Sequence, residues 1–141
     1  MEQPIVHGWK LCRVLYCGLA AAVLSFHIDA NAQSAFPYDR DLVLDARPMR
    51  GGKRVPVLSI EQNGRAQIDL WCKRGSGQAT IAGDTITIAI GAMNDETCTP
   101  ERMQADEDML ATLSQATNWS QRGDVVTLAG TKVVRFRLAT N

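Results

Sequence analysis

The 141-residue chain carries 15 basic and 15 acidic side chains, so its formal net charge is zero. It therefore has no overall basic field that would attract nucleic acid or anionic lipid. Both histidines, His7 and His27, lie in the first 32 residues. Without that segment the chain has no histidine for acid–base catalysis and lacks the usual ligands of zinc. We therefore expect a protein that is not an enzyme and uses no metal or other cofactor.

Segment 1–32 has the pattern of a secretory signal peptide. Lys10 and Arg13 supply positive charge before an apolar run that is shorter than the ~20 residues of a membrane-spanning helix. Ala30 and Ala32 place small residues at the −3 and −1 positions of a cleavage site. The alternative is an uncleaved membrane anchor. We expect cleavage near Ala32, a periplasmic or secreted protein, and no stable membrane insertion of the mature chain.

After the leader, the polar residues 33–41 predict a flexible N-terminal arm. The rest, 42–141, is long enough for one domain with a modest core. Alternating apolar and β-branched residues predict seven strands in this domain. The expected strands cover 42–44, 55–60, 66–72, 78–82, 85–90, 124–128 and 132–138.

Glycine-containing turns separate the expected strands. Asn63-Gly64 predicts a two-residue hairpin of type I′, which needs positive φ at both central residues. Gly75-Ser76-Gly77 predicts a second turn.

One helix interrupts the strands. Thr99 is a suitable N-cap, Pro100 fits the first helical position, and the helix is expected to end at Thr117 or Asn118. The acidic residues near its start suit the helix dipole. The resulting fold class is α+β: an antiparallel β-meander, as a curved sheet or partial barrel, packed with one inserted helix. The expected apolar face of the helix contains Met103, Leu110, Leu113 and Ala116, with Met109 beside it.

Removal of the leader leaves two cysteines, Cys72 and Cys98, and hence one possible intramolecular disulfide. Cys72 ends an expected strand and Cys98 precedes the helix cap, so a disulfide would pin the start of the helix to the sheet. Closing a loop of about 25 residues would stabilise the fold by roughly 3 kcal/mol. The alternatives are two buried free thiols, or a redox-active Cys98 near the helix start.

Two further features are candidates for binding. Trp71 and Trp119 would be anchors for a protein partner if exposed, and core residues otherwise. A basic loop around Gly51-Gly52 is expected to be simply solvated, with binding of phosphate or another anion as the alternative. Its cations are Arg47, Arg50, Lys53 and Arg54.

The chain resembles a known family from about Val57 to Leu128. Four motifs, which occur in the same order as in that family, carry the resemblance. The chain resembles the META domain, the family of the HslJ-like heat-shock envelope proteins. Trp71, Lys73 and Thr97 depart from the family pattern beside the two cysteines. The motifs are Trp71-Cys72-Lys73, Gly83-Asp84 with the strand after it, Thr97-Cys98-Thr99-Pro100 opening an acidic helix, and Gly123-Asp124 with its strand.

The resemblance implies a compact envelope domain, associated with heat shock and with a fold like that of secretin pilotins. We therefore predict an exported, non-enzymatic, stress-related module that binds other envelope proteins or acts like a chaperone. An exposed apolar patch would favour this hypothesis. One alternative is a carrier of a small apolar, lipid-like ligand, which needs an apolar pocket between helix and sheet. Another is a protease-inhibitor-like module presenting Gly75-Ser76-Gly77 as a rigid loop. The sequence leaves the oligomeric state open.

Overall fold

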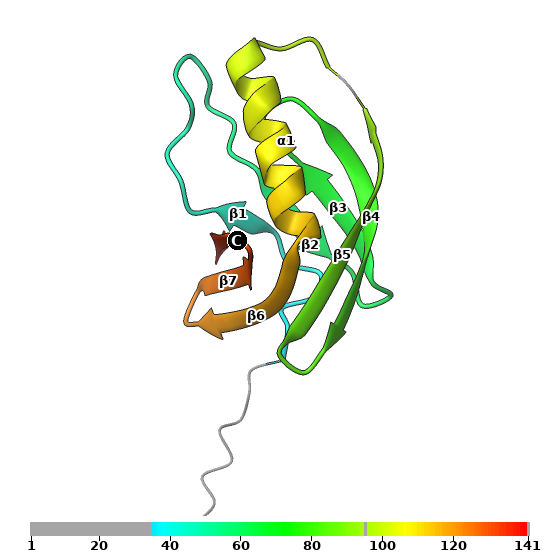
Figure 1. The fold of residues 1–141 in the computed structure, drawn as a ribbon. Helices are drawn as coiled ribbons and strands as arrows, with labels where there is room; N and C mark the ends of the chain where they lie inside the picture. Colours follow the sequence, from blue (N-terminus) through cyan, green and yellow to red (C-terminus); the bar gives the residue numbers. More distant parts are fainter. Residues whose placement is uncertain (1–34, 95, 141) are drawn as a thin grey trace, which may run out of the picture. The chain divides into compact units, whose positions relative to one another are not determined.

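Eight antiparallel strands form a closed barrel in the computed structural model, which describes residues 35–94 and 96–140 (Figure 1). Helix α1 (Pro100–Ser114) lies between the fifth and sixth strands of the chain. The predicted α+β class, an antiparallel meander with one inserted helix, is confirmed. The strands are β1 (Leu42–Leu44), β2 (Val57–Ile60), β3 (Arg65–Asp69), β4 (Arg74–Ala82), β5 (Thr85–Asn94), β6 (Ala116–Arg122), β7 (Val125–Gly130) and β8 (Val133–Leu138).

Neighbouring strands in the chain pair with each other, and β8 pairs with β1 to close the barrel. The predicted leader, 1–32, falls outside the described residues. Among the residues that are described, no helix has the length and apolar character needed to cross a membrane.

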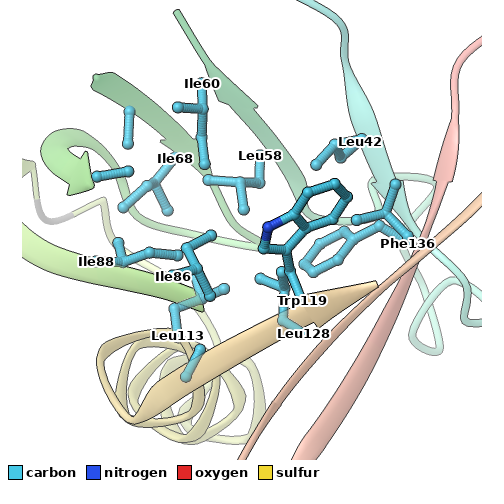
Figure 2. Close-up of a cluster of buried hydrophobic side chains, with 14 of the residues drawn as sticks. Leu42, Leu58, Ile60, Ile68, Ile86, Ile88, Leu113, Trp119, Leu128 and Phe136 are labelled. Atoms are coloured by element: carbon cyan, nitrogen blue, oxygen red, sulfur yellow. The ribbon is translucent and has the colours of Figure 1, made fainter. Parts of the chain in front are cut away.

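Alternate side chains of the strands point inward and fill the barrel (Figure 2). The inward residues of β2 alternate with half-buried ones, as a strand with one face in the core requires. Each large aliphatic side chain buried in this way contributes roughly 1.5–3 kcal/mol. The most buried inward residues are Leu42, Leu58, Ile60, Ile68, Ile86, Ile88, Val126, Leu128 and Phe136.

The hairpin at Asn63-Gly64 is present, but the predicted type I′ turn is wrong. Among the described residues, positive φ occurs at Asp39 and at four glycines, including Gly64 at 85°, but not at Asn63. The Gly64 amide donates to the Glu61 carbonyl, and the Glu61 amide donates to the Arg65 carbonyl. This is a three-residue loop, a type I turn followed by a glycine in the left-handed region.

The turn predicted at Gly75-Ser76-Gly77 is also wrong, because these residues belong to β4. The register between β4 and β5 shifts between Gly75 and Gly77, which marks a β-bulge. A Cβ on Gly75 would collide with the Ala92 carbonyl oxygen, and one on Gly77 with that of Ala89. The glycines therefore permit close approach of two backbones. The actual turn is Leu70–Lys73, closed by a hydrogen bond of 2.8 Å from the Leu70 amide to the Lys73 carbonyl.

Strand β6 was not predicted, and the helix ends at Ser114 rather than at Thr117 or Asn118. Ala116 and Trp119 are the buried residues of β6. These two residues are three positions apart, which is a helical spacing. The spacing arises because a register shift between Ala116 and Asn118 breaks the alternation expected of a strand.

The helix face also differs from the prediction. Met109 and Leu113 are buried as expected, but Met103 is 46% exposed, and Asp106 completes the buried face. The prediction assumed that the buried face of the helix is entirely apolar. Asp106 lies on that face, so the apolar pattern is broken there.

Helix α1 lies beside the shortest strand pairing of the barrel. Strands β5 and β6 are paired at one position in the described part of the chain, Thr85 with Asn118. Beyond this pair α1 lies beside β5, and Leu113 packs near Ile86 (Figures 1 and 2). A helix over an unpaired strand edge prevents pairing with other chains.

Residues 36–41, part of the segment 33–41 that was predicted to be a flexible arm, contact the domain, whereas residues 33 and 34 lie outside the described residues. Phe36 is 5% exposed and packs edge-to-face on Trp119, with ring centroids 5.0 Å apart. The Asp39 amide donates to the Ile60 carbonyl at 2.9 Å. The polar composition of this segment concealed its two aromatic residues, Phe36 and Tyr38, which both pack against the core.

Arg137 on β8 joins two neighbouring segments at the surface. Its Nε donates to Asp45 at 2.9 Å and its Nη1 donates to Asp124 at 3.3 Å. The hydrogen bond to Asp45, aided by the charge of that carboxylate, raises the pKa of the Arg137 guanidinium. Such exposed ion pairs contribute little to stability.

Phe36→Ala tests whether the arm belongs to the folded domain. Loss of a buried ring should lower the free energy of unfolding by about 3 kcal/mol, measured by chemical denaturation. Arg40→Ala, at an exposed position of the same segment, is the control and should change the free energy of unfolding by less than about 0.5 kcal/mol. Equal, small effects of both substitutions would contradict the packing of Phe36.

Candidate functional site

The β3–β4 turn is bound to the helix by a single buried carboxylate. Asp106 lies on the inner face of α1 and has no solvent exposure. Its Oδ1 accepts from the Trp71 amide at 3.0 Å, and its Oδ2 accepts from the amides of Cys72 and Lys73 at 2.9 and 2.7 Å. A buried carboxylate is stable only when hydrogen-bonded, and these three charge-assisted bonds meet that need.

The sequence contained little sign of this role. Asp106, Glu107 and Asp108 are consecutive acidic residues near the start of a helix. Negative charge at this place is explained by a favourable interaction with the helix dipole, without any further role. A helical wheel centred on Met109 and Leu113 would have placed Asp106 on the buried face, because residues three and seven positions apart share a side. Glu107 points elsewhere and pairs with the Lys73 ammonium.

A disulfide between Cys72 and Cys98 links the same turn to the residue before the N-cap of α1, with a Cα–Cα distance of 6.0 Å. Cys72 is 1% exposed. Thr99 occupies the N-cap position and Pro100 the first turn, although the Thr99 side chain makes no capping bond. We use the name turn clamp for the Asp106 hydrogen bonds together with this disulfide.

The two candidate tryptophans differ in their surroundings. Trp119 is 5% exposed, and its Nε1 donates to the Gly83 carbonyl at 2.8 Å. Trp119 is therefore a core residue and not available as a contact anchor. Trp71 is half-buried and packs against the core, and its buried Nε1 has no hydrogen-bond acceptor among the described residues.

Several hollows open on the described surface, and three of them are considered as binding sites. One, which we call the outer groove, has a volume of about 670 Å³ and lies across β2, β3, β4 and the end of β5. The loop pocket, about 280 Å³, lies between the 45–56 loop and the start of α1. The helix groove, about 270 Å³, lies between α1 and the start of β8. Trp71 borders the last two.

The outer groove is lined by polar and charged side chains. Asp69 sits between two arginines, with its Oδ1 3.1 Å from Arg74 Nε and 3.8 Å from Arg54 Nη1. Both pairs are partly exposed and therefore weak. Other polar residues of the groove are Asp41, Ser59, Arg65, Gln67, Ser76 and Asn94.

The described part of the chain does not contain a cluster of metal ligands. Residues 33–141 contain no histidine. Among the described residues, no three histidine, cysteine or acidic side chains are grouped as a metal site would require. The structure therefore brings together a clamp and three surface hollows.

Comparison with known proteins identifies one family. The META domain model matches residues 40–141. A solved structure, titled only as an NMR structure of a protein, has a TM-score of 0.56 and 21% identity, covering 70% of this chain and 88% of its own. This similarity concerns the fold alone. Comparison with curated proteins gives no match.

Asp106→Asn tests the turn clamp. The amide keeps the shape of the carboxylate but replaces one oxygen by a donor, so at least one turn N–H would face another N–H. We expect the free energy of unfolding to fall by about 2–3 kcal/mol, measured by denaturant titration.

Asp108→Asn is the matched control, because Asp108 is an exposed aspartate two positions away. It should change the free energy of unfolding by less than about 0.5 kcal/mol. Equal effects of the two substitutions would show that the carboxylate of Asp106 does not hold the turn.

Proposed function

The chain belongs to the META domain family, and on that premise we propose that it is an exported, non-enzymatic module that binds other envelope proteins. Binding uses the outside of the barrel, because the interior is filled by core side chains. The observation that carries the proposal is the outer groove, the largest of the hollows described above.

The chemistry of the outer groove favours a polar partner. Its arginines, aspartates, amides and hydroxyls offer both donors and acceptors to a charged, extended segment of another protein. The Asp69–Arg74 pair is weak in water and is readily exchanged for contacts with a partner. The closed barrel and the turn clamp keep these groups in place, which lowers the entropic cost of binding.

A chaperone-like role has less support than specific binding. Capture of unfolded chains needs a broad exposed apolar patch. Within the described residues, the large apolar side chains that are clearly exposed are Met103 and Val133, at 46% and 66%. They lie on different elements, and the proposal therefore places recognition in polar contacts. A link to heat shock or another stress remains part of the proposal.

The two alternative functions have less support than protein binding. A carrier of a lipid-like ligand needs an apolar cavity between helix and sheet, but Leu113 and Ile86 fill that space (Figure 2). The helix groove, with Val133 and Val134 at its edge, is open and small. A protease inhibitor would present Gly75-Ser76-Gly77 as a loop, whereas these residues form part of β4.

Site-specific photo-crosslinking in the host envelope tests the use of the outer groove. A photoreactive residue at Gln67, inside the outer groove, should give a discrete protein adduct that mass spectrometry can identify. The same residue at Ser120, exposed on β6, is the matched control and should not give that adduct.

A double variant tests whether the adduct depends on the charges of the outer groove. Arg65→Glu combined with Arg74→Glu reverses charge in the outer groove and should abolish the Gln67 adduct while the protein stays folded. Identical adducts from Gln67 and Ser120, or an adduct that survives the charge reversal, would contradict binding in the outer groove.

The intact mass of protein recovered from the host envelope tests export and cysteine pairing together. After alkylation without reduction, the mass should correspond to a chain that begins at Gln33 and carries no alkyl group. Retention of the leader would contradict the proposed export. Alkylation of both Cys72 and Cys98 would contradict an oxidising compartment.

A further inference from the structure

We propose that the loop pocket binds a phosphate-bearing anion, an activity separate from protein binding in the outer groove. Its walls come from the 45–56 loop, the β3–β4 turn and the first turn of α1. Lys53, Arg54 and Arg102 face it together with one carboxylate, that of Glu96. A local excess of positive charge in an otherwise neutral chain is an anion-binding feature.

Most hydrogen-bond donors of the three cations in the loop pocket have no acceptor among the described residues. Lys53 makes no hydrogen bond or ion pair within the part of the chain that the structure describes. Arg54 makes one long contact, 3.8 Å to Asp69. Arg102 donates one hydrogen bond, from Nη2 to the Arg50 carbonyl at 3.3 Å. A guanidinium has five N–H donors, so most of them remain available to a ligand.

Arg102 is positioned by the glycine loop beneath it. A Cβ on Gly52 would lie 2.7 Å from Arg102 Nη2, so the guanidinium rests directly over the Gly52 backbone and a side chain there would push it aside. The Gly52 amide donates to the Met49 carbonyl at 3.0 Å, and Gly51 has φ of 73°. The loop is thus folded into a turn that holds Arg102, half-buried, at the pocket.

Trp71 provides a probe of the loop pocket. Its ring borders both the loop pocket and the helix groove, and its buried Nε1 has no acceptor among the described residues. A ligand beside this ring would therefore shift the indole N–H resonance. The cations of the loop pocket select a ligand that is negatively charged.

The dimensions and donors favour phosphate. A volume of about 280 Å³ is at the lower end for small-molecule sites and fits a phosphate ester with a small organic body. Arginine forks bind phosphate oxygens in pairs, and lysine adds a point charge. A soluble phosphate ester and a phospholipid head group share this chemistry.

NMR titration of ¹⁵N-labelled protein recovered from the envelope tests this site. Inorganic phosphate and glycerol 3-phosphate represent the soluble source, and vesicles of phosphatidic acid in phosphatidylcholine represent the lipid source. The indole N–H resonance of Trp71 should move in a saturable way. That of Trp119, already bonded to Gly83, should stay in place and is the internal control.

Charge-matched variants complete the test. Lys53→Gln and Arg102→Gln should each weaken binding at least tenfold, whereas Arg135→Gln, at an exposed position of β8 outside the loop pocket, should leave it unchanged. Lys53 makes no described contact, so its variant separates binding from folding. Response to the soluble esters, or to acidic vesicles alone, supports the site and identifies its source.

Three results would overturn the proposal. The Trp71 resonance could fail to saturate with every probe, it could shift equally in Lys53→Gln and Arg135→Gln, or pure phosphatidylcholine vesicles could shift it as much as acidic ones.

Discussion

The fold depends on one electrostatic interaction, the acceptance of three consecutive backbone N–H groups by the buried carboxylate of Asp106. These bonds hold the β3–β4 turn against α1, and the Cys72–Cys98 disulfide connects the same two parts covalently. The position of α1 matters because β5 and β6 pair at one described position, and the helix contacts β5 beyond that pair. The clamp therefore fixes the helix beside the shortest strand pairing of the closed barrel.

Both proposed binding surfaces border the clamped turn. Trp71, the first residue bound by Asp106, forms part of the loop pocket, and Arg74, directly after the turn, lines the outer groove. Core side chains occupy the barrel interior, so the proposed recognition uses these outer surfaces. Rigid support of surface side chains by the clamp would favour the proposed binding, because less entropy is lost when a partner is bound.

The sequence predicted the order of elements well, because alternation and turn residues reflect local physics. The prediction was wrong where contacts between residues distant in the sequence determine the local structure. Gly75 and Gly77 indicated a turn, yet serve the close approach of β4 and β5. Polar β6 was missed because a register shift conceals its alternation. Asp106 was missed because its partners are backbone amides more than 30 residues away, which leave no pattern in the side chains.

Hydrogen exchange of individual amides tests the central claim most directly. The account predicts that the amides of Trp71, Cys72 and Lys73 exchange as slowly as those of the core strands, although they lie in a turn. In Asp106→Asn these three amides should lose protection while those of β7 and β8 keep theirs. Rapid exchange of the three turn amides in the unaltered protein would contradict the claim that the carboxylate of Asp106 holds the structure together.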